Sequence, residues 1–525
     1  MRKIYVAFSL ILTVIFIYRG HAQMLESDPM KMSYLADRIS EDSIRSYLEV
    51  LASDEFEGRE TGMEGNFKAA AFLAKKLKQF GYETPINTRD YSQFFPLYKQ
   101  SWKKVDIKIE GNEYHAQRDF YALPSGNPNL PSFNAGELVY LGFGIQNDNT
   151  DDFSEADLAN KAVIIHEGSP PELKLSGGGQ NGLSNTKLNA ATEAGVRLIL
   201  VISEHFSSRL ARLRPFLLSP SLTTNIPESS RTNVVYISPG MASSIMAGYE
   251  DKILNYREEK YQNRKNKTSP VVIEKPVVAN LHKITEYEYV PNVVGFLEGN
   301  DRDLKHEVLV ISAHFDHLGI RGKDIFNGAD DDGSGTSSVL EIARVLADIS
   351  KSGEEGLKRS VLIFFANGEE KGLLGSAYYS DNPLYPVSST ITNLNVDMIG
   401  RRDEFHEDNP YYVYIIGSDK LSTDLHEINE SVNSSLTNLE LDYKYNDPAD
   451  PNRFYYRSDH YNFAKKNIPV IFYFTGVHED YHRPTDTIEK IEFAKMTKIV
   501  ELIFGTAWEL LSRDERPLVD KNGEQ

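Results

Sequence analysis

The chain has 525 residues, more than a single hydrophobic core usually accommodates, so we expect two domains. Its 40% hydrophobic and 25% charged residues are ordinary for a folded protein exposed to water. With 57 basic and 76 acidic residues the net charge is −19, which argues against nucleic-acid and anionic-membrane partners, because both require a basic face.

The N-terminus has the pattern of a secretory signal. Two basic residues precede a largely apolar stretch at 4–17, and a small-x-small cleavage site ends at Ala22. An uncleaved anchor is the weaker interpretation, because the stretch is short for a bilayer span. The chain has no cysteine, so it lacks both disulfides and the lipobox residue of a lipoprotein. We therefore expect residues 1–22 to be removed from an exported protein, periplasmic or secreted, with no stable membrane insertion.

Residues 23–117 are predicted to form the first part of the larger domain. Apolar residues at helical spacing predict helices at 43–51 and 66–80, and Gly81 is a typical stop for the second. From Trp102 the period changes to two, which favours a strand.

Residues 118–278 are predicted to form a smaller inserted domain. Strand-like runs occur at 137–141, 161–165 and 198–202, and a helix pattern at 188–194. None of the candidate site residues described below falls in this segment.

Residues 279–515 alternate between strand and helix patterns, and 516–525 form a C-terminal tail. The predicted strands are 308–313, 360–366, 392–398, 412–416 and 470–474, and the predicted helices 337–346 and 496–511. Apolar runs that do not alternate suit strands buried on both faces. The fold class is therefore α/β, with a mixed, mostly parallel central sheet flanked by helices.

Candidate metal ligands stand at the ends of the predicted strands. These are two histidines and four carboxylates, in the order His314, Asp331, Glu369, Glu370, Asp397 and His482. Taken singly, each has an ordinary surface or core interpretation. In open α/β sheets, however, ligands bind beyond the carboxyl ends of the strands. The ordered set therefore predicts a two-metal hydrolase site.

The motifs around these residues resemble those of the M28 family of zinc exopeptidases. They are His314-Phe315-Asp316, the run 328–335, Asn367-Gly368-Glu369-Glu370, the run 397–401 and the run 480–487. The resemblance covers most of residues 287–512. Residues 118–278 more weakly resemble the protease-associated (PA) insert of many members, through 138–145 and 161–164. The resemblance implies a zinc exopeptidase/phosphorylase-like fold with a smaller β-rich PA domain.

The resemblance also implies a ligand set. One ion would be bound by His314, Asp331 and Asp397, and the other by Asp331, Glu370 and His482, with Asp331 bridging the pair. Imidazole and carboxylate ligands suit two zinc ions, although manganese or cobalt could occupy such a site. His317 and His478 lie near these motifs, and for both we expect rim or outer-shell roles rather than metal binding.

Three further residues receive catalytic or positioning roles by the same resemblance. Glu369 is the expected general base, because its neighbour Glu370 is needed as a ligand; the alternative is that both bind metal. Asp316 would fix the tautomer of His314. Tyr455 would stabilise the oxyanion, although Tyr456 beside it is an alternative. Asp459 and His460 are interpreted as structural.

The leading functional hypothesis is an aminopeptidase (EC 3.4.11.-) that hydrolyses the N-terminal residues of peptides with a metal-bridging water activated by Glu369. A carboxypeptidase of the glutamate carboxypeptidase type would need basic residues in the pocket beyond the scissile bond, and the sequence does not place Arg401, Arg402, Arg453 or Arg457 there. A mono-zinc glutaminyl cyclase or a binding protein is less consistent with a complete ligand set. The insert could bind substrate, cover the cleft or mediate oligomerisation.

Overall fold

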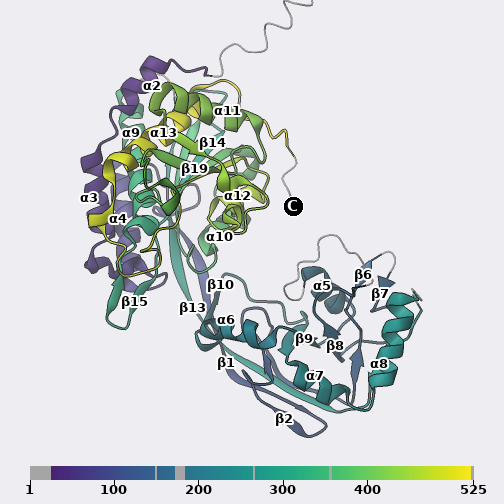
Figure 1. Cartoon of the computed structure of the whole chain (residues 1–525). Coiled ribbons are helices and arrows are strands. Elements are labelled where there is room, and N and C mark those ends of the chain that lie inside the picture. Colours follow the sequence, from purple (N-terminus) through teal and green to yellow (C-terminus); the bar gives the residue numbers. More distant parts are fainter. Residues whose placement is uncertain (1–24, 148–149, 172–183, 264–266, 354–356, 522–525) are drawn as a thin grey trace, which may run out of the picture. The chain divides into compact units, whose positions relative to one another are not determined.

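The computed structural model describes residues 25–147, 150–171, 184–263, 267–353 and 357–521 (Figure 1). The predicted signal segment lies outside these ranges, as does the end of the tail. Within them, none of the helices combines the length and apolar character that a membrane crossing needs. The chain divides into unit 1, which contains the residues up to Phe95 and from Tyr289 onward, and unit 2, Pro96–Glu288.

Unit 1 is built on a mixed sheet with strand order β13-β17-β14-β18-β21-β19-β20. These strands are β13 (Val277–Leu297), β14 (Val308–His314), β17 (Ser360–Ala366), β18 (Thr390–Val396), β19 (Tyr412–Ile416), β20 (Glu440–Asp442) and β21 (Val470–Phe474). The central strands β17, β14, β18 and β21 are parallel, whereas β13 and β19 run antiparallel to their neighbours β17 and β21. The predicted fold class is confirmed.

Helices cover both faces of this sheet because its central strands are apolar on both sides. In β14, Leu309 and Ile311 pack into a core with the large helices, whereas Val308 and Val310 pack on the opposite face. The helices of unit 1 are α2 (Pro29–Ala36), α3 (Glu41–Leu51), α4 (Glu64–Phe80), α9 (Gly335–Ser352), α10 (Leu374–Asp381), α11 (Thr423–Val432), α12 (His460–Ala464) and α13 (Phe493–Ser512). The unalternating runs noted in the sequence thus correspond to strands with no solvent-facing side.

The first helices of the described chain pack against its last helix in unit 1. Helices α2, α3 and α4 pack with α9 and α13 in one core. Glu509 of α13 accepts hydrogen bonds from the backbone N–H groups of Glu26 (2.8 Å) and Ser27 (3.0 Å). The predicted N-terminal helices are confirmed, and α4 ends at Gly81, whose left-handed φ of 89° suits glycine.

Unit 2 has its own sheet, of strand order β12-β5-β8-β9-β11-β3. These strands are β3 (Phe120–Tyr121), β5 (Leu138–Tyr140), β8 (Ala162–His166), β9 (Leu198–Ile202), β11 (Asn233–Ile237) and β12 (Val271–Ile273), with helices α5 (Asn185–Glu193), α6 (Phe206–Leu218), α7 (Pro239–Met246) and α8 (Glu250–Arg257). Two long strands, β1 (Ser92–Ile109) and β13, continue from unit 1 into unit 2. The compact unit is therefore wider at both ends than the predicted insert 118–278.

Candidate metal centre

Three neighbouring strands deliver their functional side chains to one edge of the unit 1 sheet. His314 is the last residue of β14, Glu369 and Glu370 follow β17, and Asp397 follows β18. Because β14 pairs in parallel with both β17 and β18, these carboxyl ends lie side by side. His482 reaches the same edge from the loop after β21.

Asp331 reaches this edge from the segment Ala329–Ser334, which leads into α9. The buried Asp486 carboxylate accepts the backbone N–H of Asp330 at 3.1 Å and that of Asp331 at 3.2 Å. The loop is therefore held through its backbone, and the Asp331 side chain is left available to the centre.

The carboxylates on either side of Asp331 accept hydrogen bonds from the backbone of neighbouring segments. Asp332 accepts the backbone N–H of Gly335 (2.8 Å) and of Met398 (3.2 Å). Asp330 accepts the N–H of Gly400 at 2.6 Å and lies 3.1 Å from His478 Nε2. His478 thus steadies the loop from behind, in agreement with the outer role expected of it.

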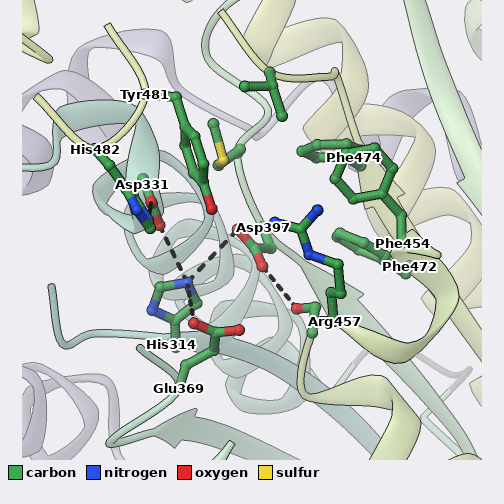
Figure 2. A pocket seen from close by; sticks show the side chains of 13 residues that line it. His314, Asp331, Glu369, Asp397, Phe454, Arg457, Phe472, Phe474, Tyr481 and His482 are labelled. Carbon is green, nitrogen blue, oxygen red and sulfur yellow. Dashed lines mark hydrogen bonds and ion pairs between the residues drawn. The ribbon is translucent and has the colours of Figure 1, made fainter. Parts of the chain in front are cut away.

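The side chains of the centre form two donor sets that share Asp331 (Figure 2). Asp331 Oδ1 lies 3.4 Å from His314 Nε2, which is also 3.6 Å from Asp397 Oδ1. Asp331 Oδ2 lies 3.2 Å from His482 Nε2, which is also 3.2 Å from Glu370 Oε2. The structure therefore brings together all five predicted ligand positions, with one oxygen of Asp331 directed toward each set.

Asp316 acts on His314 differently from the prediction. The hydrogen-bond partner of His314 Nδ1 is the backbone oxygen of Asp316, at 3.1 Å, whereas its carboxylate Oδ1 is 3.8 Å away. That carboxylate accepts the hydroxyl of Thr61 (2.9 Å) and the backbone N–H of Glu369 (3.1 Å). One residue thus orients the imidazole through its backbone and the Glu369 loop through its side chain.

His317 lies closer to the centre than expected. Its Nδ1 is 2.8 Å from Glu370 Oε1 and 3.7 Å from Asp331 Oδ2, and the ring is buried. Glu370 therefore stands between two imidazoles, His317 on one oxygen and His482 on the other. His482 is the more accessible of the two, with 37% of its side chain exposed.

Of the two predicted tyrosines, neither lines the cavity beside the centre. Tyr455 packs edge-on against His460 at 5.5 Å between ring centroids, and His460 stacks on Phe472 at 4.8 Å. The tyrosine in the cavity wall is Tyr481, whose ring stacks on His482 at 3.8 Å (Figure 2). Its position next to a ligand histidine in Asp480-Tyr481-His482 is the sequence signal that could have indicated it.

The charges of the centre are strongly coupled. Burial raises the pKa of Glu369 well above its usual range; the His314 charge opposes this shift, and the carboxylates of Glu370 and Asp397 reinforce it. Burial alone would lower the pKa of His482, but the Asp331 and Glu370 carboxylates raise it to about 10. The nearby carboxylates thus favour the charged form of His482.

This donor set fits divalent cations. Three buried atoms, both ring nitrogens of His317 and Glu370 Oε1, have no hydrogen bond to any described residue. His317 Nδ1 and Glu370 Oε1 lie 2.8 Å apart, but without the geometry of a hydrogen bond. Buried polar atoms left without partners are costly. A cation bound at Glu370 would give its Oε1 atom a partner.

Arg59 connects the N-terminal segment to the centre and was not predicted to do so. Its guanidinium, 1% exposed, donates to the backbone oxygens of Phe315 (2.8 Å), Leu51 (2.5 Å), Asn327 (2.6 Å) and Gly328 (2.9 Å). Three of these acceptors, Phe315, Asn327 and Gly328, flank the loops that carry His314 and Asp331. A single side chain thus fixes the spacing of two ligand loops.

We expect Arg59→Ala to lower the free energy of unfolding of unit 1 by at least about 3 kcal/mol, because it leaves several buried carbonyl groups without a donor. Chemical denaturation followed by Trp508 fluorescence in a Trp102→Phe background measures this, since the chain has only these two tryptophans and Trp508 lies in unit 1. The control is Arg89→Ala, which removes an exposed arginine of unit 1. A change no larger than in the control would contradict the bracing role.

Comparison with known proteins agrees with the fold. Residues 292–507 match the model of peptidase family M28. A probable leucine aminopeptidase of Arthroderma otae is 29% identical over 245 residues, which cover 46% of this chain and 63% of the relative. A probable zinc metalloprotease of Pyrenophora teres f. teres is 25% identical over 301 residues, covering 49% of this chain and 59% of the relative. The chain thus spans less than two thirds of these relatives.

Among solved structures, the aminopeptidase from Aneurinibacillus sp. strain AM-1 has the same fold, with a TM-score of 0.53 and 17% identity over 94% of this chain and 100% of that one. The parallel sheet and the donors gathered at its carboxyl edge make unit 1 a candidate metal-binding domain. The match to peptidase family M28 lies wholly within unit 1 and covers less than half of the chain. The family match does not extend to unit 2, so its likeness to a PA domain stays a prediction.

Proposed function

We propose that this protein is a two-zinc aminopeptidase that removes N-terminal residues from peptides. The observation that carries the proposal is the position of Asp331, whose two carboxylate oxygens face different histidines, His314 at 3.4 Å and His482 at 3.2 Å. A shared aspartate between two donor sets is the arrangement that two co-catalytic ions require.

His314, Asp331 and Asp397 would hold one zinc ion, and Asp331, Glu370 and His482 the other, with His317 against Glu370. When bound, the ions would lower the pKa of a water and polarise the scissile carbonyl group. Zinc suits mixed imidazole and carboxylate donors, and the Pyrenophora relative is described as a zinc metalloprotease.

Glu369 is proposed to carry the proton. Its carboxylate lines the cavity 4.0 Å from His314 Nε2, the longest of the carboxylate approaches to that ring, so it is free to accept a proton from water and pass it to the leaving amine. A raised pKa lets the protonated form persist long enough to act as the acid. The Asp316 carboxylate holds the backbone of Glu369, and Ser458 donates to Asp397 at 2.7 Å, which steadies a ligand.

The alternatives are separable by one assay. The enzyme is incubated with aminoacyl-p-nitroanilides and with matched N-acetylated peptides, with and without a chelator. We expect hydrolysis of the free-amine substrates only, abolished by the chelator and restored by zinc. Cleavage of the blocked peptides alone would indicate a carboxypeptidase, and cyclisation of N-terminal glutamine with one zinc per chain would indicate the cyclase.

Tyr481 is proposed as the phenol that stabilises the oxyanion. We expect Tyr481→Phe to lower kcat by about 10²-fold with little change in KM, because such a donor acts in the transition state. Tyr455→Phe is the matched comparison, since the sequence favours that residue and the packing favours Tyr481. A larger loss in Tyr455→Phe would return the role to Tyr455.

Export to the periplasm or medium is also proposed, on the sequence of residues 1–22 alone. N-terminal sequencing of protein from the producing cells tests it, with Gln23 expected as the first residue.

A further inference from the structure

The cavity beside the centre has a cation in an otherwise apolar wall. One side is formed by residues of the centre, and a second wall by Phe454, Phe472 and Phe474; Met398, Val477 and Tyr481 also line the cavity. Arg457 lies in this second wall, and Figure 2 shows its side chain directed into the cavity on the side of the phenylalanine rings. Arg457 is itself exposed to solvent, so its guanidinium is accessible to an anion that enters the cavity.

The charge of Arg457 is not neutralised within the described part of the chain. No carboxylate there lies within 4.0 Å of its guanidinium. The guanidinium carbon lies over the ring of Phe454, 4.8 Å from the ring centroid. The other arginines nearby are occupied: Arg401 pairs with Asp480 at 3.1 Å, and Arg402 with Glu492 at 3.0 Å. Arg457 is thus both directed into the cavity and without an anion.

The chemistry of the side chain defines the ligand. A guanidinium offers parallel N–H donors that match the two oxygens of a carboxylate. Stacking on Phe454 restricts its motion before any ligand arrives, which reduces the entropic cost of binding.

We propose that Arg457 binds a carboxylate group of the substrate and thereby determines specificity. The inference rests on the proposed peptidase function and adds the class of substrate to it. The carboxylate has two sources: the side chain of an N-terminal glutamate or aspartate, or the α-carboxylate of a short peptide.

Two pairs of substrates separate these sources. Glutamyl- and glutaminyl-p-nitroanilide differ in the side-chain charge, and Leu-Gly and Leu-glycinamide differ in the terminal carboxylate. In wild type we expect a preference for the charged member of one pair. Arg457→Met should reduce that preference in kcat/KM by about 10- to 100-fold, as expected for a charge-assisted hydrogen-bonded pair. Arg457→Lys keeps the positive charge but lacks the parallel N–H donors of the guanidinium, so it should retain part of the preference for the charged substrate.

The control is Arg453→Met, which removes an exposed arginine stacked on Tyr456 at 4.6 Å and absent from the cavity wall; it should keep the wild-type preference. Titration calorimetry of free glutamate and glutamine, and of Leu-Gly and Leu-glycinamide, provides a readout without turnover. If no p-nitroanilide or peptide is cleaved, the proposed function fails, whereas a charge preference in binding that Arg457→Met abolishes would still support this inference. Equal handling of both pairs by wild type and Arg457→Met, in turnover and in binding, would overturn it.

Discussion

Glu369→Gln should lower kcat by about 10²- to 10⁴-fold while the protein still binds two metal ions. Glutamine keeps the size of the side chain and cannot accept the proton. The backbone N–H of Glu369 bonds to Asp316, so the substitution leaves the loop anchored. Turnover of a leucyl substrate measures the loss, and elemental analysis of the purified protein measures the metal content.

Glu370→Gln is the matched control, because the adjacent carboxylate faces both His317 and His482. It should lose metal as well as activity, whereas Glu369→Gln should lose activity alone. Normal turnover in Glu369→Gln would remove that residue from the proton-transfer role. Loss of metal in Glu369→Gln would make it a ligand, the alternative that the sequence left open.

Asp331→Ala should have the other large effect, the loss of both ions rather than one. Each oxygen of Asp331 serves a different donor set, so its removal weakens both. A ligand that binds only the folded state at 1,000 times its Kd adds about 4 kcal/mol of stability. A chelator should therefore lower the Tm of the zinc-loaded wild type by several degrees and leave that of Asp331→Ala unchanged.

His482→Ala tests the separation of the two donor sets. It removes a donor on one side of Asp331 and leaves His314 and Asp397 on the other, so about one ion per chain should remain. A residual content of two ions would mean that His317 replaces His482 against Glu370.

Full metal binding by Asp331→Ala would refute the shared-aspartate arrangement.

Much of the fold of unit 1 could be predicted because its strands are continuous apolar runs with clear boundaries. The runs 360–366, 412–416 and 470–474 coincide with β17, β19 and β21 at both ends, since each is buried throughout and bounded by polar or turn residues. The predicted helices at 337–346 and 496–511 were too short, because α9 and α13 extend further at both ends, by as much as six residues at the C-terminus of α9. Parallel pairing then brings ligand residues together without further information.

The parts of the site that could not be predicted depend on contacts between distant segments. Arg59 bonds to Gly328, 269 residues away, and no local pattern signals that contact. The choice between Tyr455 and Tyr481, and the place of Arg457 in the wall, depend on side-chain packing after the strands have assembled. His317 was expected at the rim because the motif assigns its ligand role to His314, and only the fold reveals that its ring faces Glu370.

The meeting of α2 with α13 has a consequence for how the protein is made. On the ribosome, helices α2, α3 and α4 emerge long before their apolar partners in α13. Unit 2, contiguous from Pro96 to Glu288, can complete its own core while the earlier helices are still unpartnered. The N-terminal helices must therefore remain without these partners until α13 has been synthesised, and we expect closure over such a long sequence separation to be slow.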